Sequence, residues 1–265
     1  MRVWVASLIF YAFVFVICEV LRHLIITLIP NPKRLSTQLL LEFVGTLQIC
    51  TPMFDVGTVM DNYGLWGVFI EITVIELANC YFMRDSVANP CPIVTCCYRK
   101  SKAVRRAVYV FLAQLSAAYL SYYFARSFWK LGLHPLHSEL LEENECSTDL
   151  TVALTVGCLI EGLATFVGKA FEHYSSQYTD NEVYCSIANC VFSGFICALG
   201  ILYTGMYANP IVAWACTFNC EGVSHIGHLV VYWLSPLIGW YLAEMVFGEE
   251  EQEVLDEPDG DKKKE

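Results

Sequence analysis

Ala88-Asn89-Pro90-Cys91 and Ala208-Asn209-Pro210-Ile211 are two Asn-Pro pairs that stand 120 residues apart, each in a stretch too apolar for an ordinary loop. Asn is favourable at a helix N-cap, and Pro fits the first helical turn because its missing N–H needs no partner there. Each pair therefore predicts a short helix that begins inside a membrane. One such start in each half of the chain indicates an inverted repeat around a pore.

The composition is that of an integral membrane protein. Of the 265 residues, 56% are hydrophobic and 16% are charged, and the mean hydropathy is +0.47. Soluble domains hold roughly 25% charged residues. The sequence predicts an all-α protein with apolar segments near the length that spans a bilayer. These segments are Val3–Ile29, Leu35–Met53, Leu65–Phe82, Val104–Phe128, Leu150–Ala170, Tyr184–Tyr203 and Gly227–Phe247.

The two ends of the chain differ from its middle. Residues 1–30 form an additional hydrophobic segment, for which a cleaved signal peptide is one interpretation. Glu19, Arg22 and His23 late in that segment, and the lack of a small-residue cleavage site, favour a retained helix. Residues 248–265 concentrate acidic side chains, which predicts a disordered, solvated tail. The net charge of −11 owes much to this tail, and no nucleic-acid partner is expected.

Basic residues predict how the chain crosses the membrane. They gather around the first Asn-Pro pair and before the second apolar segment, and positively charged loops normally face the cytosol. The first Asn-Pro loop and the C-terminus are then cytosolic, and the second Asn-Pro loop enters from the opposite face. Cys146, Cys216 and Cys220 fall on that opposite side, where a disulfide can form, but the sequence alone gives no pairing.

Two acidic residues inside apolar segments repeat at nearly the same offset as the Asn-Pro pairs. Glu42 and Glu161 lie 119 residues apart, and an acid inside a spanning helix normally faces the protein interior. A re-entrant loop has N–H groups that find no acceptor in lipid, so each Glu is predicted to anchor one loop. The alternative is a Glu that faces water in the lumen of the pore.

Four further motifs, in this order and spacing, make the sequence resemble the aquaporin family over about residues 35–247. They are Glu42-Phe43-Val44-Gly45-Thr46, Ala113-Gln114, Tyr203-Thr204-Gly205 and Tyr232-Trp233-Leu234-Ser235-Pro236-Leu237-Ile238-Gly239. Three features resemble the unorthodox branch of that family, the superaquaporins. They are Cys91 in place of the Ala of Asn-Pro-Ala, the additional N-terminal segment, and Cys220 eleven residues after Asn209.

The resemblance implies six transmembrane helices and two re-entrant half-helices, with one repeat in about 35–128 and the other in about 150–247. It also implies a homotetramer in membrane lipid. In the family the half-helices meet at the bilayer midplane, where Asn89 and Asn209 would donate hydrogen bonds to a passing molecule and the helix dipoles oppose cations.

The resemblance further implies which residues select the solute. Aligned through the motifs, the constriction falls at Phe69, Cys197, Met206 and Val212. Val212 stands where a strict water channel has Arg, so the ring is apolar. Such a ring implies passage of water and small neutral solutes, glycerol and hydrogen peroxide among them, with no cofactor and no metal.

Two other classes of function compete with a channel. A membrane enzyme is disfavoured because the histidines and acids of two polar regions lack the spacing of a metal site. These residues are His134, His137 and Glu139 in a polar loop, and His225 and His228 near a helix start. The second alternative is an aquaporin fold with an occluded pore and a structural or junctional role, because Ile211 adds bulk beside Asn209.

Lys262 and Lys263 stand at the fourth and third positions from the C-terminus. On a cytosolic tail they resemble a di-lysine retrieval signal, which predicts a multi-pass protein of an intracellular membrane, the endoplasmic reticulum. The alternative is a basic patch that ends an acidic tail.

Overall fold

The computed structural model describes residues 1–29, 31, 34–84, 86–99, 104–143 and 145–248. Over these residues the chain is helical, with one isolated bridge between Ser147 and Glu221 and no strand. The predicted all-α membrane fold is confirmed. The acidic tail with Lys262 and Lys263 lies outside the described residues.

Six stretches of the described chain are long and apolar enough to cross a membrane. Five of them are α1 Val3–Leu28, α5 Val104–Trp129, α7 Leu154–Tyr178, α8 Glu182–Thr204 and the stretch His225–Phe247. The last consists of α10 His225–Leu229, a π-helical segment η3 Val230–Leu234, and α11 Ser235–Phe247.

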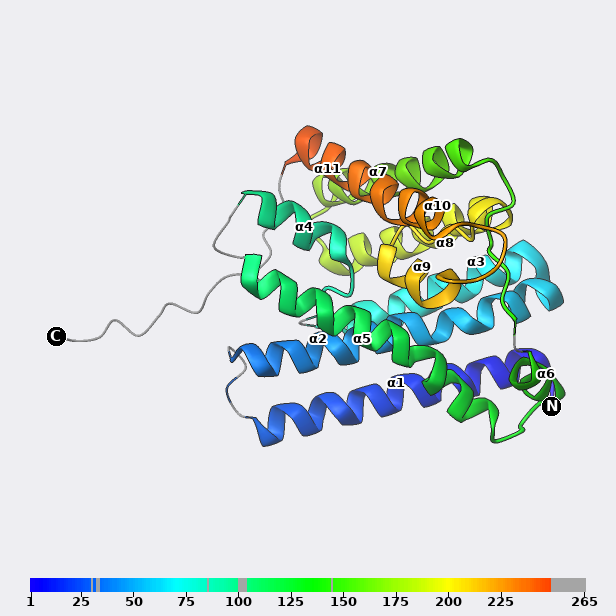
Figure 1. Cartoon of the computed structure of the whole chain (residues 1–265). Helices are drawn as coiled ribbons and strands as arrows, with labels where there is room; N and C mark the ends of the chain where they lie inside the picture. The colour runs from blue at the N-terminus through cyan, green and yellow to red at the C-terminus, as the bar shows by residue number, and fades with distance from the viewer. Residues whose placement is uncertain (30, 32–33, 85, 100–103, 144, 249–265) are drawn as a thin grey trace.

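The sixth stretch, Leu35–Phe82, folds back on itself. Its 48 residues would extend about 72 Å at 1.5 Å per residue, which is too long for one crossing. The chain reverses at Gly64, whose φ of 63° and ψ of −161° are not helical, and two antiparallel legs result (Figure 1). The stretch contains α2 Leu35–Cys50, a 3₁₀ segment η1 Thr51–Asp55, and α3 Val56–Phe82. With α1 as the additional helix, the bundle therefore has the six legs and the extra N-terminal helix that the resemblance implies.

Three short helices complete the fold. The half-helices α4 Pro90–Arg99 and α9 Pro210–Thr217 begin at the two Asn-Pro pairs and lie between the long helices (Figure 1). The segment predicted as a polar loop instead forms α6 Pro135–Glu142. His134 caps this helix, because its Nδ1 accepts from the Leu136 N–H at 3.2 Å.

The N-terminal helix α1 packs against the bundle through apolar and polar contacts. The ring of Phe10, which is fully buried, lies 5.0 Å from that of Phe128 in α5. Arg22 Nη2 donates to Gln48 Oε1 at 2.6 Å, and Gln48 Nε2 donates to Asn79 Oδ1 at 2.9 Å. Buried polar groups in a membrane need such partners. This chain of contacts joins α1 to both legs of Leu35–Phe82.

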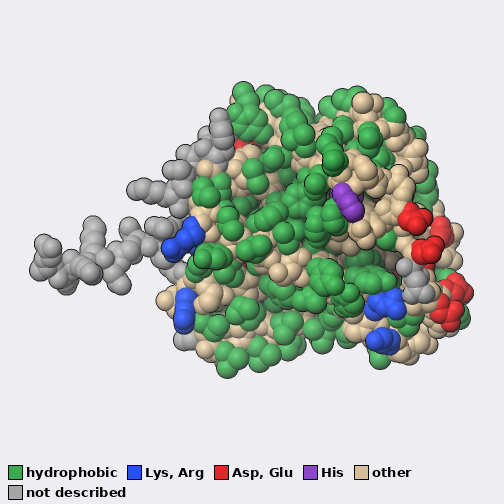
Figure 2. All heavy atoms as spheres, viewed as in Figure 1, with side chains coloured by type: hydrophobic (Ala, Val, Ile, Leu, Met, Phe, Trp, Pro, Cys, Tyr) green, Lys and Arg blue, Asp and Glu red, His purple; other side chains and the backbone are tan. Residues whose placement is uncertain are grey.

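The surface has the distribution expected in a bilayer. Hydrophobic side chains cover the middle of the face seen in Figure 2, and the charged side chains visible there gather toward its two ends. An apolar band between charged rims places the band against lipid and the charges near water. The ends of α1, α3 and α11 that carry the predicted cytosolic loops lie together at one end of the bundle (Figure 1).

Helices α7 and α11 cross at a pair of glycines. A Cβ atom on Gly239 would lie 2.2 Å from the carbonyl oxygen of Gly162, so no side chain fits there. Small residues allow helix backbones in membranes to approach closely. The last residue of the Tyr-Trp motif thus has a packing role.

Candidate functional site

A buried glutamate holds each Asn-Pro loop. Glu42 of α2 accepts hydrogen bonds from the backbone N–H groups of Val87 at 2.9 Å and Ala88 at 2.7 Å. In the second half, Glu161 of α7 accepts from Tyr207 at 3.2 Å and Ala208 at 2.8 Å. Both glutamates are fully buried. Each carboxyl group thus supplies acceptors to N–H groups that lipid cannot satisfy.

The two loops share an uncommon backbone conformation. Ala88 has a φ of 47° and Ala208 a φ of 46°, each directly before its Asn. An L-residue in this left-handed region costs roughly 1–2 kcal/mol. The hydrogen bonds to Glu42 and Glu161 offset this cost in both halves, and the repeat is therefore visible in the geometry as well as in the sequence.

Asn89 and Asn209 cap the two half-helices. Asn89 Oδ1 accepts from the Cys91 N–H at 2.9 Å, and Asn209 Oδ1 accepts from the Ile211 N–H at 3.1 Å. Asn209 Nδ2 donates to the carbonyl oxygen of Ala88 at 2.9 Å, which joins the second loop to the first. The N-termini of α4 and α9 therefore meet, with the positive ends of both helix dipoles close together.

A cavity of about 780 Å³ lies beside the second loop. Its walls come from α2, η1, α3, the segment before α7, α7, α8, the loop before α9, α9 and α11. Of the residues predicted for the site, Cys197, Met206, Asn209 and Val212 line it. Phe69, Asn89, Cys91 and Ile211 are not among the lining residues.

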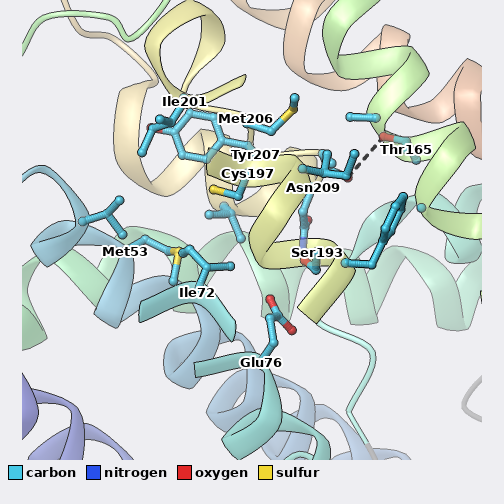
Figure 3. Close-up of a pocket in the computed structure, with 18 of the residues that line it drawn as sticks. Met53, Ile72, Glu76, Thr165, Ser193, Cys197, Ile201, Met206, Tyr207 and Asn209 are labelled. Carbon is cyan, nitrogen blue, oxygen red and sulfur yellow. Dashed lines mark hydrogen bonds between the residues drawn. The ribbon is translucent and has the colours of Figure 1, made fainter. Parts of the chain in front are cut away.

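The lining of the cavity has an apolar part and polar parts. Met53, Ile72 and Ile201 gather around Cys197 and Met206 at the apolar part (Figure 3). One polar part is lined by Glu76, Thr165, Lys169, Glu172, Ser186, Asn189 and Ser193, and the segment before α7 adds Thr148, Asp149 and Thr151. A neutral solute in this cavity would therefore meet both apolar surface and hydrogen-bonding groups.

Glu76 is a cavity residue that the sequence reasoning did not single out. Its carboxylate points into the cavity from α3 (Figure 3), and it has no hydrogen-bond partner among the described residues. An acid inside an apolar segment was the signal that identified Glu42 and Glu161, and the same signal applies to Glu76.

Curated relatives cover most of the chain, whereas no family model matches it. The sequence is 23% identical over 234 residues to aquaporin-11 of Milnesium tardigradum. This alignment covers 88% of this chain and 83% of the tardigrade protein. It is 25% identical over 212 residues to aquaporin-11 of Homo sapiens, over 78% of this chain and 76% of that protein. It is also 25% identical over 250 residues to aquaporin-12 of Mus musculus, an alignment that covers 91% of this chain and 84% of that protein.

The chain is similar over most of its length to proteins named as aquaporins. The relatives' names, aquaporin-11 and aquaporin-12, are those of the unorthodox branch that its motifs resemble. These names indicate a membrane channel rather than an enzyme.

The constriction implied by the aquaporin resemblance is assembled only in part. Three of its four residues share the cavity, but the structure does not bring Phe69 into this group. The Phe69 ring packs edge-on against Trp66, with 5.9 Å between centroids. Ile72, three residues later in α3, packs with Cys197 instead. Three residues are close to one helical turn, so Phe69 and Ile72 lie on neighbouring turns of α3. The place of Phe69 in the constriction stays a prediction.

Ile211 and Cys91 stand where orthodox aquaporins have Ala. Ile211 is fully buried and packs with Cys50 and Ala118, and Cys91 is 1% exposed. The bulk of Ile211 is therefore accommodated in the protein core, behind the loop, and not in the cavity.

Cys220, the cysteine that resembles the branch, forms a disulfide with Cys146. Cys216 in α9 remains a free thiol. The sequence alone did not decide which of Cys146, Cys216 and Cys220 form the disulfide, and the structure pairs Cys146 with Cys220. Beside the disulfide, Thr148 N–H donates to the Glu221 carbonyl at 2.8 Å and Glu221 N–H to the Cys146 carbonyl at 2.9 Å. These contacts tie the segment after α9 to the segment before α7.

A phenol and a carboxyl group meet in the wall of the cavity, beside the second Asn-Pro loop. The Tyr207 hydroxyl donates to Asp149 Oδ2, and both residues line the cavity. Burial raises the pKa of Asp149 above its ordinary value, and it raises the pKa of Tyr207 as well. The pair holds the loop that carries Asn209 against the segment before α7.

The histidines considered as metal ligands have structural contacts. His137 packs edge-on against Phe128 at 5.4 Å, and its burial lowers its pKa. His228 Nε2 lies 3.2 Å from Thr217 Oγ1, and His225 Nε2 lies 2.9 Å from Asn219 Oδ1. Within the described part of the chain, no three His, Cys, Asp or Glu side chains are grouped to hold a metal ion.

Proposed function

We propose that the protein is a channel that passively conducts water and small neutral solutes, glycerol and hydrogen peroxide among them. The observation that carries this proposal is the position of Asn209, which caps α9, bonds to the first loop and lines the cavity. A side-chain amide has two N–H groups. One is used on Ala88, so the second can donate to a solute in the cavity.

The surroundings of Asn209 support neutral solutes over ions. Two helix N-termini place positive dipole ends at this level and disfavour cations. Cys197, Met206 and Val212 form an apolar wall that offers no fixed charge to an anion, and Val212 leaves out the Arg of a strict water channel. A solute with both hydrogen-bonding groups and an apolar face, such as glycerol, fits this lining.

Flux into vesicles tests the proposal. Stopped-flow light scattering would follow proteoliposomes under water and glycerol gradients, and an enclosed peroxide sensor would follow hydrogen peroxide. Permeabilities above those of empty vesicles are expected. Permeabilities equal to those of empty vesicles for all three solutes would refute the proposal.

The occluded aquaporin fold is the competing candidate, and one observation favours it. Asn209 lines the cavity but Asn89 does not, so the described cavity stops short of the first loop's amide. A correctly folded, disulfide-bonded protein without flux would support this structural or junctional role instead.

The proposal includes a location in the endoplasmic reticulum with a cytosolic C-terminus. Supporting it, the described basic residues Arg34, Arg84 and Arg105 flank the ends of α2, α3 and α5 that lie on the same side as the end of α11 (Figure 1). We expect Lys262→Ser with Lys263→Ser to move a tagged protein to the cell surface. An unchanged intracellular distribution would argue against the di-lysine signal.

A homotetramer in lipid is also part of the proposal. Large apolar side chains such as Trp66, Leu159 and Ile226 are exposed on the single chain and need lipid or neighbouring copies as cover. Native mass spectrometry from lipid nanodiscs would show four copies if the proposal is right, and a monomer would contradict it.

A further inference from the structure

Two thiols face each other in the wall of the cavity. Cys80 of α3 and Cys190 of α8 are 110 residues apart in sequence, and their sulfur atoms lie 3.5 Å apart. Both residues line the cavity. Neither takes part in the Cys146–Cys220 disulfide.

The two helices are already close enough for a bond between these sulfurs. Four residues after Cys190, a Cβ on Gly194 would lie 2.8 Å from the carbonyl oxygen of Phe69, so α3 and α8 pack closely on the stretch next to the two thiols. A disulfide needs sulfur atoms about 2.05 Å apart. Rotation of the two side chains about χ1 can close the remaining gap without moving either helix far.

The two thiols differ in access. Cys80 is exposed, whereas Cys190 is 4% exposed. A small oxidant in the cavity therefore reaches Cys80 first, and Cys190 is positioned to react second. A low-exposure thiol beside an accessible one is the arrangement of an attacking and a resolving cysteine.

The predicted orientation places the Cys80–Cys190 pair and the Cys146–Cys220 disulfide near opposite faces of the membrane. Cys80 lies two residues before the end of α3, close to Arg84 and the predicted cytosolic end. The Cys146–Cys220 disulfide belongs to the loops of the opposite face, next to Asp149. Thiols persist on a reducing side of a membrane and disulfides on an oxidising side.

We propose that Cys80 and Cys190 form an oxidisable dithiol, a modification site for peroxides in the cavity. The Cys80 sulfur attacks one peroxide oxygen and the O–O bond breaks. Cys80 becomes a sulfenic acid, and the hydroxide that leaves takes up the thiol proton to form water. The Cys190 sulfur then attacks the sulfenic sulfur, the S–S bond forms, the S–O bond breaks, and a second water leaves with the Cys190 proton. Two thiols are oxidised by two electrons, and one peroxide is reduced to two waters.

Peroxide titration of the purified full-length protein in detergent tests this step. We expect mass spectrometry to find a peptide pair that joins Cys80 to Cys190, with both thiols lost to maleimide labelling and both recovered after dithiothreitol. In Cys190→Ser, oxidation of Cys80 should end at the sulfenic acid, because the second thiol of the pair is absent, and dimedone should label this sulfenic acid. Cys185→Ser, a matched loss of a free thiol on α8 outside the cavity lining, should oxidise as the wild type does.

Either of two results would overturn the inference: Cys80 and Cys190 both stay reduced while other thiols oxidise, or Cys80 bonds to a different cysteine. The inference rests on the proposed function in one respect: in a membrane, the proposed channel would bring peroxide into the cavity. The detergent experiment needs no flux, so a bond without vesicle permeability would remove the channel proposal alone, and permeability without the bond would remove the dithiol alone.

Discussion

Replacement of Glu161 tests whether a buried carboxyl group holds the second Asn-Pro loop. Glu161 accepts two backbone hydrogen bonds, at 3.2 and 2.8 Å, and is fully buried. A hydrogen bond to a charged group contributes about 1.5–3 kcal/mol. Glu161→Gln keeps one acceptor oxygen and loses one bond, whereas Glu161→Leu loses both. Because either change also removes the cost of burying a carboxylate, the lower values apply, about 1.5 kcal/mol for Gln and about 3 kcal/mol for Leu.

The assay is the apparent free energy of unfolding, measured by chemical denaturation in detergent. Glu172→Gln is the matched control, because this acid of the same helix α7 is 48% exposed and pairs with Lys169 in the polar part of the cavity wall. Exposed ion pairs contribute about 0–1 kcal/mol. We expect the order Glu172→Gln, Glu161→Gln, Glu161→Leu in increasing loss of stability. A Glu161→Leu protein as stable as Glu172→Gln would show that Glu161 does not hold the loop and would favour a Glu that faces water.

Three further changes test the filter, a helix crossing and the disulfide. Val212→Arg adds a positive side chain to the cavity wall and should reduce glycerol flux relative to water flux in stopped-flow assays; an unchanged ratio would show that Val212 does not select the solute. Gly239→Val should lower the unfolding midpoint, because its Cβ meets a backbone oxygen at 2.2 Å, whereas Gly168→Ala, with open space around it, should be neutral or stabilising by up to about 1 kcal/mol. Loss of the disulfide in Cys146→Ser or Cys220→Ser should lower the free energy of unfolding by about 2–4 kcal/mol. The double variant should lose no more than either single variant; a larger, additive loss would show that the two cysteines act separately.

The helices follow from the sequence because hydrophobic length is a strong signal in a membrane. All seven apolar segments correspond to helical legs, and the two Asn-Pro pairs begin α4 and α9. The end of the second segment differs, since helix continues beyond Met53 through η1 to the turn at Gly64. Pro52 did not end the helix because it lies at the start of η1, where a proline needs no N–H partner.

Parts of the site were beyond sequence reasoning because they depend on register and on contacts distant in sequence. The sequence alone does not decide whether Phe69 or Ile72 packs against Cys197, because the two lie about one turn apart on α3. The partner of Cys220 depends on how two loops meet, and the approach of Cys80 to Cys190 depends on how α3 packs on α8. Glu76 was within reach, because it is an acid in an apolar segment.

The most direct test of the meeting of the two half-helices is a cryo-electron microscopy map of the protein in lipid nanodiscs, at a resolution that shows ordered water. We expect a continuous file of water through the cavity between the two faces of the membrane, with one water in hydrogen-bond contact with Asn209 Nδ2. A dry, closed passage at Ala88 and Asn209, or an Asn209 amide turned away from the cavity, would contradict the central claim that these helix ends hold an amide over a path for neutral molecules.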